Sequence, residues 1–250
     1  MTDLALSRLD DGILTITLNR PDKHNALSLD LIEALHDAVE AAHRNAQARV
    51  VILTGAGRSF CAGMDLRGVI TDVPAMSRML DTLAMTALRI RALPVPTIAM
   101  VNGAAVGGGC GLMVVTDLAI THPDAKVGYP EVDLGVCPAV VAPHLIRKIG
   151  AGRARAMLLS GGTITGEEGH RRGLVDHLVP REQLESFTHD LARKLATGGR
   201  HAQAVTKRWL NELDGSLDEA IAHRAASLSA EVIAGEEAQT NLRRLFGVSG

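Results

Sequence analysis

TIAMVNGAAVGGGCG, residues 97–111, is the part of this 250-residue sequence that says most about its architecture. Its first five residues are apolar or β-branched and predict a buried strand. The nearly uncharged segment continues to Val115, about the length of a membrane span, but it carries Asn102 and five glycines and follows Pro94 and Pro96. A buried strand, a turn and a helix fit this composition better than a membrane helix does, so no membrane insertion is expected.

Strands and helices alternate on the N-terminal side of this segment. Residues 49–54, RVVILT, form a second β-branched apolar run, which Gly55 ends. Residues 4–9 and 13–18 alternate in polarity as the two strands of a β-hairpin do. Between the hairpin and the apolar run, apolar residues recur at helical spacing after Ser28, a suitable N-cap. This alternation predicts an α/β fold.

The C-terminal part of the chain is predicted to be mainly helical. Residues 165–168, TGEE, form a capping box before a short helix, and residues 174–179 are the last candidate strand. We expect two parts, a core at 1–195 and a helical region at 196–250 that packs against neighbouring subunits as well as against its own core. The helical region holds the only tryptophan, Trp209.

Composition argues against several kinds of partner. The formal net charge of -2 gives no basic face for nucleic acid or an anionic membrane, and with 2% aromatic residues no base-stacking surface is expected. Cys61, Cys110 and Cys137 form neither a CxxC pair nor a cluster with histidine, so the sequence predicts no disulfide and no metal site. Because no charged leader precedes an apolar run at the N-terminus, a cytoplasmic location is expected.

Two glycine-rich segments each follow a predicted strand. They are residues 54–66, TGAGRSFCAGMDL, and residues 101–111. Glycine lets a ligand approach the main chain, and the first amides of a following helix point outward with the positive end of the helix dipole behind them. Such amides suit a developing oxyanion. A dinucleotide site is not expected, because Phe60 stands where the third glycine of a GxGxxG pattern belongs.

Four motifs resemble the enoyl-CoA hydratase/isomerase (crotonase) family in order and spacing, within about residues 4–247. They are NRPxKxNAL at 19–27, FCAGMDL at 60–66, NGxxxGGG at 102–109 and PExxLGxxP at 130–138. The resemblance implies a spiral of ββα units with a C-terminal helical trimerisation region, assembled as a homotrimer or homohexamer. It also implies an acyl-CoA thioester substrate and no separate cofactor, since coenzyme A is part of that substrate.

The same resemblance assigns roles to residues by their positions in the motifs. The backbone amides of Met64 and Gly108 are implied to form an oxyanion hole, and Glu131 falls where the family keeps a catalytic glutamate. Lys23 is either a phosphate contact or a solvated loop lysine. The backbone that receives the adenine and pantetheine parts of coenzyme A is implied to include Ala26, Leu27, Ala62, Asp65 and Leu66.

Position 111 departs from the pattern of many hydratases in the family, which carry a second glutamate there. Gly111, taken as a substrate-site position, supplies no carboxylate, and Ala139 stands where some isomerases of the family carry one. Hydration needs a base for water and an acid for the α-carbon, whereas one carboxylate can move a double bond, so this count favours an isomerase. However, Gly111 and residues 134–140, LGVCPAV, are similar to bacterial hydratases of branched enoyl-CoAs such as methylglutaconyl-CoA.

The first hypothesis is therefore a hydratase of a 2-enoyl-CoA, with apolar surroundings raising the pKa of Glu131 toward neutrality. One alternative is a Δ3,Δ2-enoyl-CoA isomerase that uses a single glutamate. Another, from a different class, is a non-catalytic acyl-CoA-binding protein. Among other polar residues near the motifs, Asp117 is interpreted as a structural turn acceptor and His144 as a packing residue.

Overall fold

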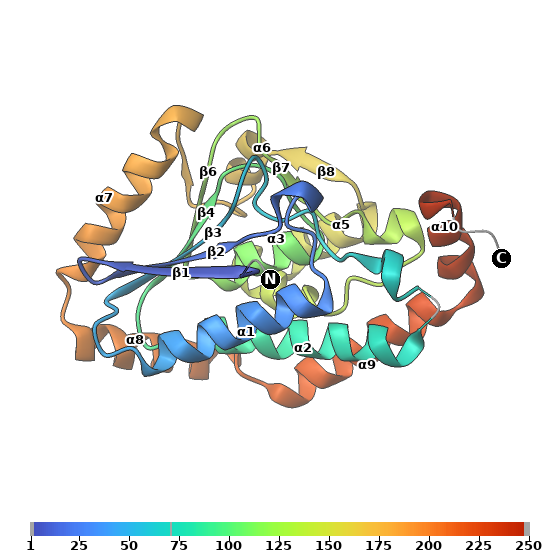
Figure 1. Cartoon of the computed structure of the whole chain (residues 1–250), viewed down its shortest axis with the longest axis horizontal. Coiled ribbons are helices and arrows are strands. Elements are labelled where there is room, and N and C mark those ends of the chain that lie inside the picture. Colours follow the sequence, from blue (N-terminus) through green and yellow to red (C-terminus); the bar gives the residue numbers. More distant parts are fainter. Residues whose placement is uncertain (1–2, 71, 248–250) are drawn as a thin grey trace.

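The structure, a computed structural model, describes residues 3–70 and 72–247 and contains two β-sheets (Figure 1). The larger sheet, in spatial order, consists of β1 (Ala5–Asp10), β2 (Ile13–Leu18), β3 (Val50–Gly55), β4 (Thr97–Val101), β6 (Leu118–Thr121) and β9 (His177–Leu178). Only β1 runs antiparallel to its neighbour. The smaller sheet consists of β5 (Ala105–Val106), β7 (Lys126–Gly128) and β8 (Thr163–Thr165).

The chain passes repeatedly from the larger sheet to the smaller one and then into a helix. Strand β4 leads to β5 and helix α3 (Gly108–Val115), and β6 leads to β7 and the 3-10 helix η3 (Pro130–Leu134). After β3 the chain again reaches the smaller sheet, but only through an isolated bridge between Cys61 and Ala105. The expected spiral of ββα units is therefore confirmed.

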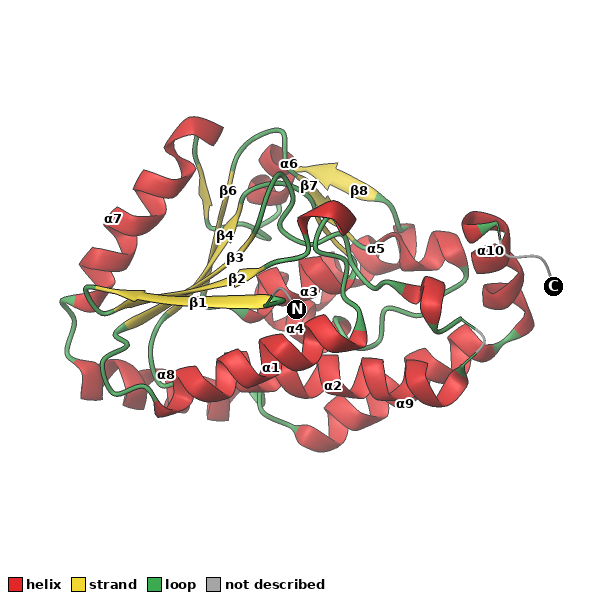
Figure 2. Ribbon diagram, viewed as in Figure 1, coloured by secondary structure: helices red, strands yellow, loops and turns green. Residues whose placement is uncertain are grey.

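Helices cover both faces of the larger sheet, which explains why all six residues of β3 are buried. Helices α1 (Leu29–Arg44) and α2 (Val73–Arg91) lie on one side of the sheet, and α7 (Leu184–Ala196) lies on the other (Figure 2). The main core forms under α1, α2 and α3, whereas Ile52 and Ile98 point to the α7 side.

Local sequence signals predicted most element ends correctly. The hairpin of β1 and β2 forms, and the Ser28 side chain accepts a hydrogen bond from the Leu31 amide at the start of α1. Thr165 accepts from the Glu168 amide at the start of α6 (Gly166–Arg171), as the capping box predicted. The predicted strand at 174–179 was too long, since only His177 and Leu178 pair. The amides of residues 174 and 175 donate instead to the Gly169 carbonyl in the turn after α6.

The remaining helices form the C-terminal half of the molecule. They are α4 (Ala142–Ile149), α5 (Ala151–Ser160), η4 (Arg181–Gln183), α8 (Arg200–Asp214), α9 (Glu219–Ala234) and α10 (Glu236–Phe246); two further 3-10 helices lie earlier, η1 (Pro21–Lys23) and η2 (Leu66–Gly68). Helix α9 lies along α2, and α10 contacts η3 (Figure 1). The division at 195/196 falls in the last turn of α7 and stays a prediction. No helix among the described residues is long and apolar enough to span a membrane.

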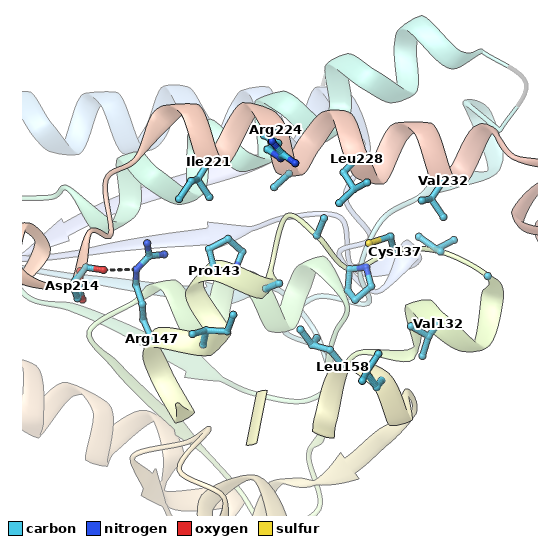
Figure 3. A pocket seen from close by; sticks show the side chains of 18 residues that line it. Val132, Cys137, Pro143, Arg147, Leu158, Asp214, Ile221, Arg224, Leu228 and Val232 are labelled. Atoms are coloured by element: carbon cyan, nitrogen blue, oxygen red, sulfur yellow. Dashed lines mark hydrogen bonds between the residues drawn. The ribbon is translucent and has the colours of Figure 1, made fainter. Parts of the chain in front are cut away.

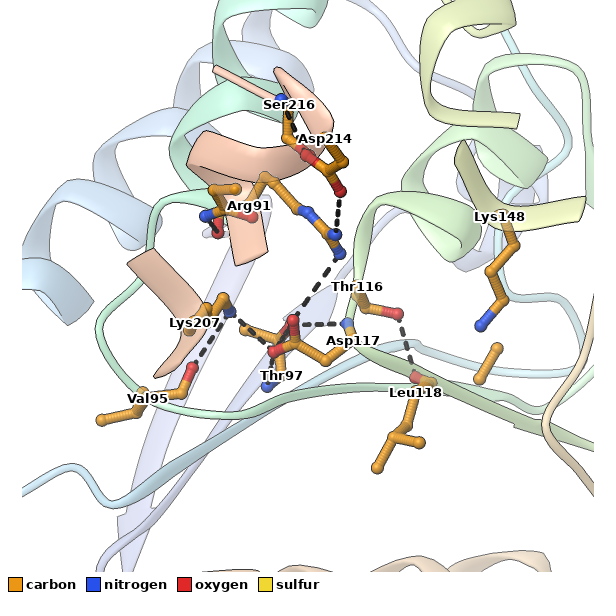
Figure 4. A network of polar contacts seen from close by, with 12 residues as sticks. Arg91, Val95, Thr97, Thr116, Asp117, Leu118, Lys148, Lys207, Asp214 and Ser216 are labelled. Carbon is orange, nitrogen blue, oxygen red and sulfur yellow. Dashed lines mark hydrogen bonds and ion pairs between the residues drawn. The ribbon is translucent and has the colours of Figure 1, made fainter. Parts of the chain in front are cut away.

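Asp117 is a structural acceptor, as predicted, but its carboxylate accepts from residues far away in the sequence and not from its own turn (Figure 4). Its Oδ2 atom accepts from the Thr97 amide at 2.8 Å and from Lys207 Nζ at 2.6 Å, and Arg91 lies 3.6 Å from its Oδ1 atom. Burial lowers the pKa of Lys207, and the negative charge of Asp117 opposes that shift. The network fastens α8 to the ends of β4 and β6.

His144 is buried in α4, as a packing residue should be. Burial lowers its pKa to about 4, and the neighbouring Arg147 adds to the shift, so the imidazole is neutral near pH 7. A neutral, buried imidazole outside the sequence motifs fits the packing interpretation.

Candidate active site

The two glycine-rich segments are held together by backbone hydrogen bonds. The Cys61 amide donates to the Ala104 carbonyl at 2.9 Å, and the Val106 amide donates to the Cys61 carbonyl at 3.0 Å. Glycine is required at position 109, because a Cβ atom there would lie 2.3 Å from the Cys61 carbonyl oxygen. These contacts place the ends of the two segments, Met64 and Gly108, side by side.

Met64 and Gly108 each present a backbone amide that lacks a backbone acceptor among the described residues. Gly108 is the first residue of α3 and follows Gly107, whose φ of +55° favours glycine, so its amide is one of the unpaired donors of a helix N-terminus. On either side of Met64, the Leu27 amide donates to the Gly63 carbonyl and the Asp65 amide donates to the Leu27 carbonyl. This pairing leaves the Met64 amide free. The pair has the donor chemistry of an oxyanion hole.

Glu131 lies against the same loop, at the start of η3. A Cβ atom at Gly107 would be 2.9 Å from Glu131 Oε1, so glycine makes room for the carboxyl group. The Oε2 atom is buried, and no described residue forms a hydrogen bond with it. Burial raises the pKa of Glu131 to about 7, and the negative charge of Asp133 adds to the shift. The carboxyl group is therefore suited to both accept and donate a proton near neutral pH.

A cavity of about 130 Å³, the acyl cavity, contacts Met64, Gly108 and Glu131 together. Glu131 is the only carboxylate among the described residues that line it. Helix α9 closes one side with Ser229 and Ile233, both buried. The other walls are mainly apolar and include Leu66, Leu80, Leu83, Val106, Leu134, Val136, Cys137, Pro138, Val140 and Val141.

Gly111 and Ala139, the two positions that lack a carboxylate, do not line the acyl cavity. A Cβ atom at Gly111 would lie 2.5 Å from Val141 Cγ1, and Val141, not Gly111, lines the cavity. Gly111 was expected among the substrate-binding residues, but the structure places the Val141 side chain between it and the cavity. Ala139 lines a neighbouring groove instead.

The residues expected at the coenzyme A end fall into two groups. Ala62 and Leu66 line the acyl cavity, whereas Leu27 is fully buried beneath Gly108, to whose Cβ position its Cδ1 atom approaches within 3.2 Å. Ala26 and Asp65 do not line the cavity and are joined by one arginine, described next. Lys23 is exposed and unpaired among the described residues, which is compatible with either of its two interpretations.

Sequence reasoning did not single out Arg20. Its Nη1 atom donates to the Ala26 carbonyl at 3.0 Å and to Asp65 Oδ2 at 2.7 Å, so it braces the loop that carries Met64. Its place in the NRP motif was the available signal. Ser229 and Ile233 were also missed, and no local signal marks them, because α9 reaches the site only through tertiary packing.

Comparison with known proteins agrees with the geometry. The chain matches the family described as enoyl-CoA hydratase/isomerase over residues 8–244. It is 34% identical over 213 residues to 2,3-dehydroadipyl-CoA hydratase of Escherichia coli K12, spanning 85% of this chain and 83% of that one. It is 35% identical over 233 residues to 1,2-epoxyphenylacetyl-CoA isomerase of the same organism, spanning 87% of each chain.

A solved structure agrees as well. An enoyl-CoA hydratase/isomerase from Xanthobacter autotrophicus Py2 superposes with a TM-score of 0.88 at 28% identity, covering 99% of this chain and 95% of that one. The chain therefore belongs to the enoyl-CoA hydratase/isomerase family. It is an enzyme of that family, an acyl-CoA hydratase or isomerase.

Proposed function

We propose that this enzyme hydrates a 2-enoyl-CoA thioester, with Glu131 as the single acid/base and the Met64 and Gly108 amides as the oxyanion hole. The observation that carries the proposal is one cavity lined by two unpaired amides and one carboxyl group whose pKa burial raises to about 7. No cofactor is invoked beyond the coenzyme A of the substrate.

The proposed reaction begins with the thioester carbonyl between the two amides. Ionised Glu131 takes a proton from a water molecule, and the resulting hydroxide adds to the β-carbon of the double bond. The electron pair of the double bond moves toward the thioester and forms an enolate, whose oxygen the amides stabilise. Each such donor contributes about 2.7–4 kcal/mol in other enzymes. Neutral Glu131 then returns the proton to the α-carbon, so water has been added and the carboxylate is regenerated.

A single carboxyl group can carry out both proton transfers because its two states are close in free energy. At a pKa near 7 neither the ionised nor the neutral form of Glu131 is strongly disfavoured near neutral pH. The apolar walls and the covering helix α9 exclude bulk water, which strengthens the interaction of the amides with the enolate oxygen.

The alternative with support of its own is a Δ3,Δ2-enoyl-CoA isomerase. Its supporting observation is that Glu131 is the only carboxylate among the described residues that line the cavity and that Val141 covers position 111. In that reaction Glu131 would remove a proton from the α-carbon and return it to the γ-carbon. A non-catalytic acyl-CoA-binding protein is less well supported, because it would have no use for a buried carboxyl group beside the two amides.

A turnover assay on matched 2-enoyl and 3-enoyl thioesters separates these functions. We expect 2-enoyl-CoA to lose its conjugated absorbance and gain the mass of one water molecule, faster than the 3-enoyl isomer is converted. Conversion of 3-enoyl-CoA to 2-enoyl-CoA without hydration would replace the proposal with the isomerase. Absence of turnover with tight acyl-CoA binding would favour the binding protein.

We also propose that the chain assembles as a homotrimer or homohexamer through its C-terminal helices. Large apolar side chains are exposed along α8 and α9, among them Trp209 at 56% and Leu213 at 64%. Further members of this apolar surface are Val205, Leu210, Leu217, Ile221 and Leu228. These side chains would be removed from water if the two helices packed against neighbouring subunits. Phe246 contributes less, because it packs on its own core and Arg67 lies over its ring at 5.5 Å.

Light scattering at micromolar concentration tests the assembly. We expect the mass of a trimer or a hexamer, and we expect Leu213→Asp to lower the mass because it places a charge within the apolar surface. Leu6→Asp is the matched control, since Leu6 is 43% exposed on β1, outside that surface. A stable wild-type monomer would contradict the proposal.

A further inference from the structure

The lining of the acyl cavity is poor in partners for a charged acyl group. Among the described residues that line it there is no lysine, arginine or histidine. The one hydroxyl group, on buried Ser229, donates its proton to the Cys137 carbonyl at 2.9 Å. An acyl chain that ended in a carboxylate would therefore bury a charge without a cation beside it, which is strongly unfavourable.

The volume of the cavity limits the length of the acyl group. About 130 Å³ is available between the walls. An engineered apolar cavity of about 150 Å³ in another protein holds one benzene ring. The acyl cavity should therefore accommodate roughly the bulk of a six-carbon chain.

A larger groove lies next to the acyl cavity, and three residues that the two share form a wall between them. Val136, Cys137 and Pro138 line both the acyl cavity and a groove of about 850 Å³. Figure 3 shows this groove between α9 on one side, which carries Leu228 and Val232, and α4 and α5 on the other. A chain longer than the acyl cavity could reach the groove only by displacing the wall.

The wall is held in place from both ends. The Val136 amide donates to the Glu131 carbonyl at 2.9 Å, and the Cys137 carbonyl accepts from Ser229 of α9. The preceding Gly135 has a φ of +72° and packs so closely on α10 that a Cβ atom there would lie 3.2 Å from Asn241 Nδ2. Displacement of the wall would thus disturb both C-terminal helices.

We infer that the acyl subsite selects short, uncharged acyl groups of up to about six carbons, and that the wall formed by Val136, Cys137 and Pro138 sets this limit. The inference rests on the proposed function insofar as the thioester lies at Met64 and Gly108. It separates this chain from the relative named for 2,3-dehydroadipyl-CoA, whose acyl group ends in a carboxylate. It likewise disfavours methylglutaconyl-CoA, to whose hydratases residues 134–140 are similar.

Calorimetric binding of saturated thioesters tests the inference without turnover, since they have no double bond to hydrate. Hexanoyl-CoA and adipoyl-CoA have equal chain lengths and differ by a terminal carboxylate. We expect adipoyl-CoA to bind at least about 30-fold more weakly. Decanoyl-CoA should bind about tenfold more weakly than hexanoyl-CoA, because its extra methylene groups meet the wall. Equal or tighter binding of adipoyl-CoA or decanoyl-CoA would overturn the inference.

Val136→Ala tests the wall directly. Removing two methyl groups from the wall should bring the affinity for decanoyl-CoA to within about threefold of that for hexanoyl-CoA. Val232→Ala is the matched control, because Val232 lines the groove but not the acyl cavity, and it should keep the wild-type ratio. If the ratio of the affinities for hexanoyl-CoA and decanoyl-CoA were the same in both variants, the wall would not set the length limit. If Val136→Ala does not fold, the wild-type series still decides whether the subsite selects short, uncharged acyl groups.

The two proposals can fail separately. If wild-type protein turns over no enoyl thioester but ranks the saturated thioesters as expected, the hydratase proposal fails and the subsite inference stands. If it hydrates carboxylated or ten-carbon substrates as readily as short neutral ones, the subsite inference fails and the hydratase proposal stands.

Discussion

Glu131→Gln is expected to lower kcat for hydration by at least about 10²-fold, the loss typical of a principal general acid/base. The amide side chain keeps the volume of the carboxyl group but cannot take up and return a proton at neutral pH. No other carboxylate among the described residues lines the acyl cavity, and Gly111 and Ala139 occupy the two positions where the family resemblance implied a further carboxylate. Acyl-CoA affinity, measured by calorimetry, should stay nearly unchanged.

Urea unfolding of the Glu131→Gln variant tests whether it is folded. Because burial raises the pKa of Glu131 from 4.5 to about 7, the folded protein binds this proton more tightly than the unfolded chain. The stability that this proton binding contributes is therefore lost as the pH rises from about 4.5 to about 7. The loss amounts to up to roughly 3 kcal/mol of unfolding free energy. In urea, Glu131→Gln should unfold at a higher midpoint than wild type at pH 8 and at a similar one at pH 4. A folded variant with full activity would exclude Glu131 as the proton carrier.

Gly108→Pro is expected to lower kcat by about 10²- to 10³-fold, because proline has no amide hydrogen and one oxyanion donor is lost. Gly108 is the first residue of α3, a position where proline fits a helix and no intrahelical hydrogen bond is broken. The change should lower kcat and also raise KM, because the proline Cδ atom takes the place of the amide hydrogen and points toward the thioester oxygen. Steady-state hydration kinetics give kcat and KM separately.

Gly108→Ala is the control for the added Cβ atom. It introduces the same Cβ atom, 3.2 Å from Leu27 Cδ1 and from Leu83 Cδ2, but keeps the amide hydrogen. We expect a much smaller loss of kcat, since two flexible methyl groups have to move by only a little. Equal losses in both variants would attribute the effect to crowding and remove the support for an oxyanion donor at this position.

The elements that sequence reasoning predicted are those specified by neighbouring residues. Strands β3 and β4 are short β-branched apolar runs, and the N-caps at Ser28 and Thr165 act within a single helical turn. The strand at 174–179 was predicted too long for the same reason. Its apolar residues resemble a strand, but Leu174 and Val175 enter the main core from a turn that depends on α6.

In the candidate site, too, the residues in local motifs were predicted, whereas those placed by tertiary contacts were not. The motifs bring Met64, Gly108 and Glu131 to one cavity, and each lies at or beside a glycine or proline that determines the local backbone. Val141 and Ser229 were not foreseen. Their roles come from contacts with residues far away in the sequence, Gly111 in one case and Cys137 in the other.

A crystal structure with hexanoyl-CoA bound tests the central claim most directly, through the distances from the thioester oxygen to the Met64 and Gly108 amide nitrogens. Both distances are expected to fall within about 2.7–3.2 Å, the range of ordinary N–H···O hydrogen bonds. The Glu131 carboxyl group is expected beside the α-carbon. A thioester oxygen more than about 3.5 Å from both nitrogens would contradict the oxyanion hole and the mechanism built on it.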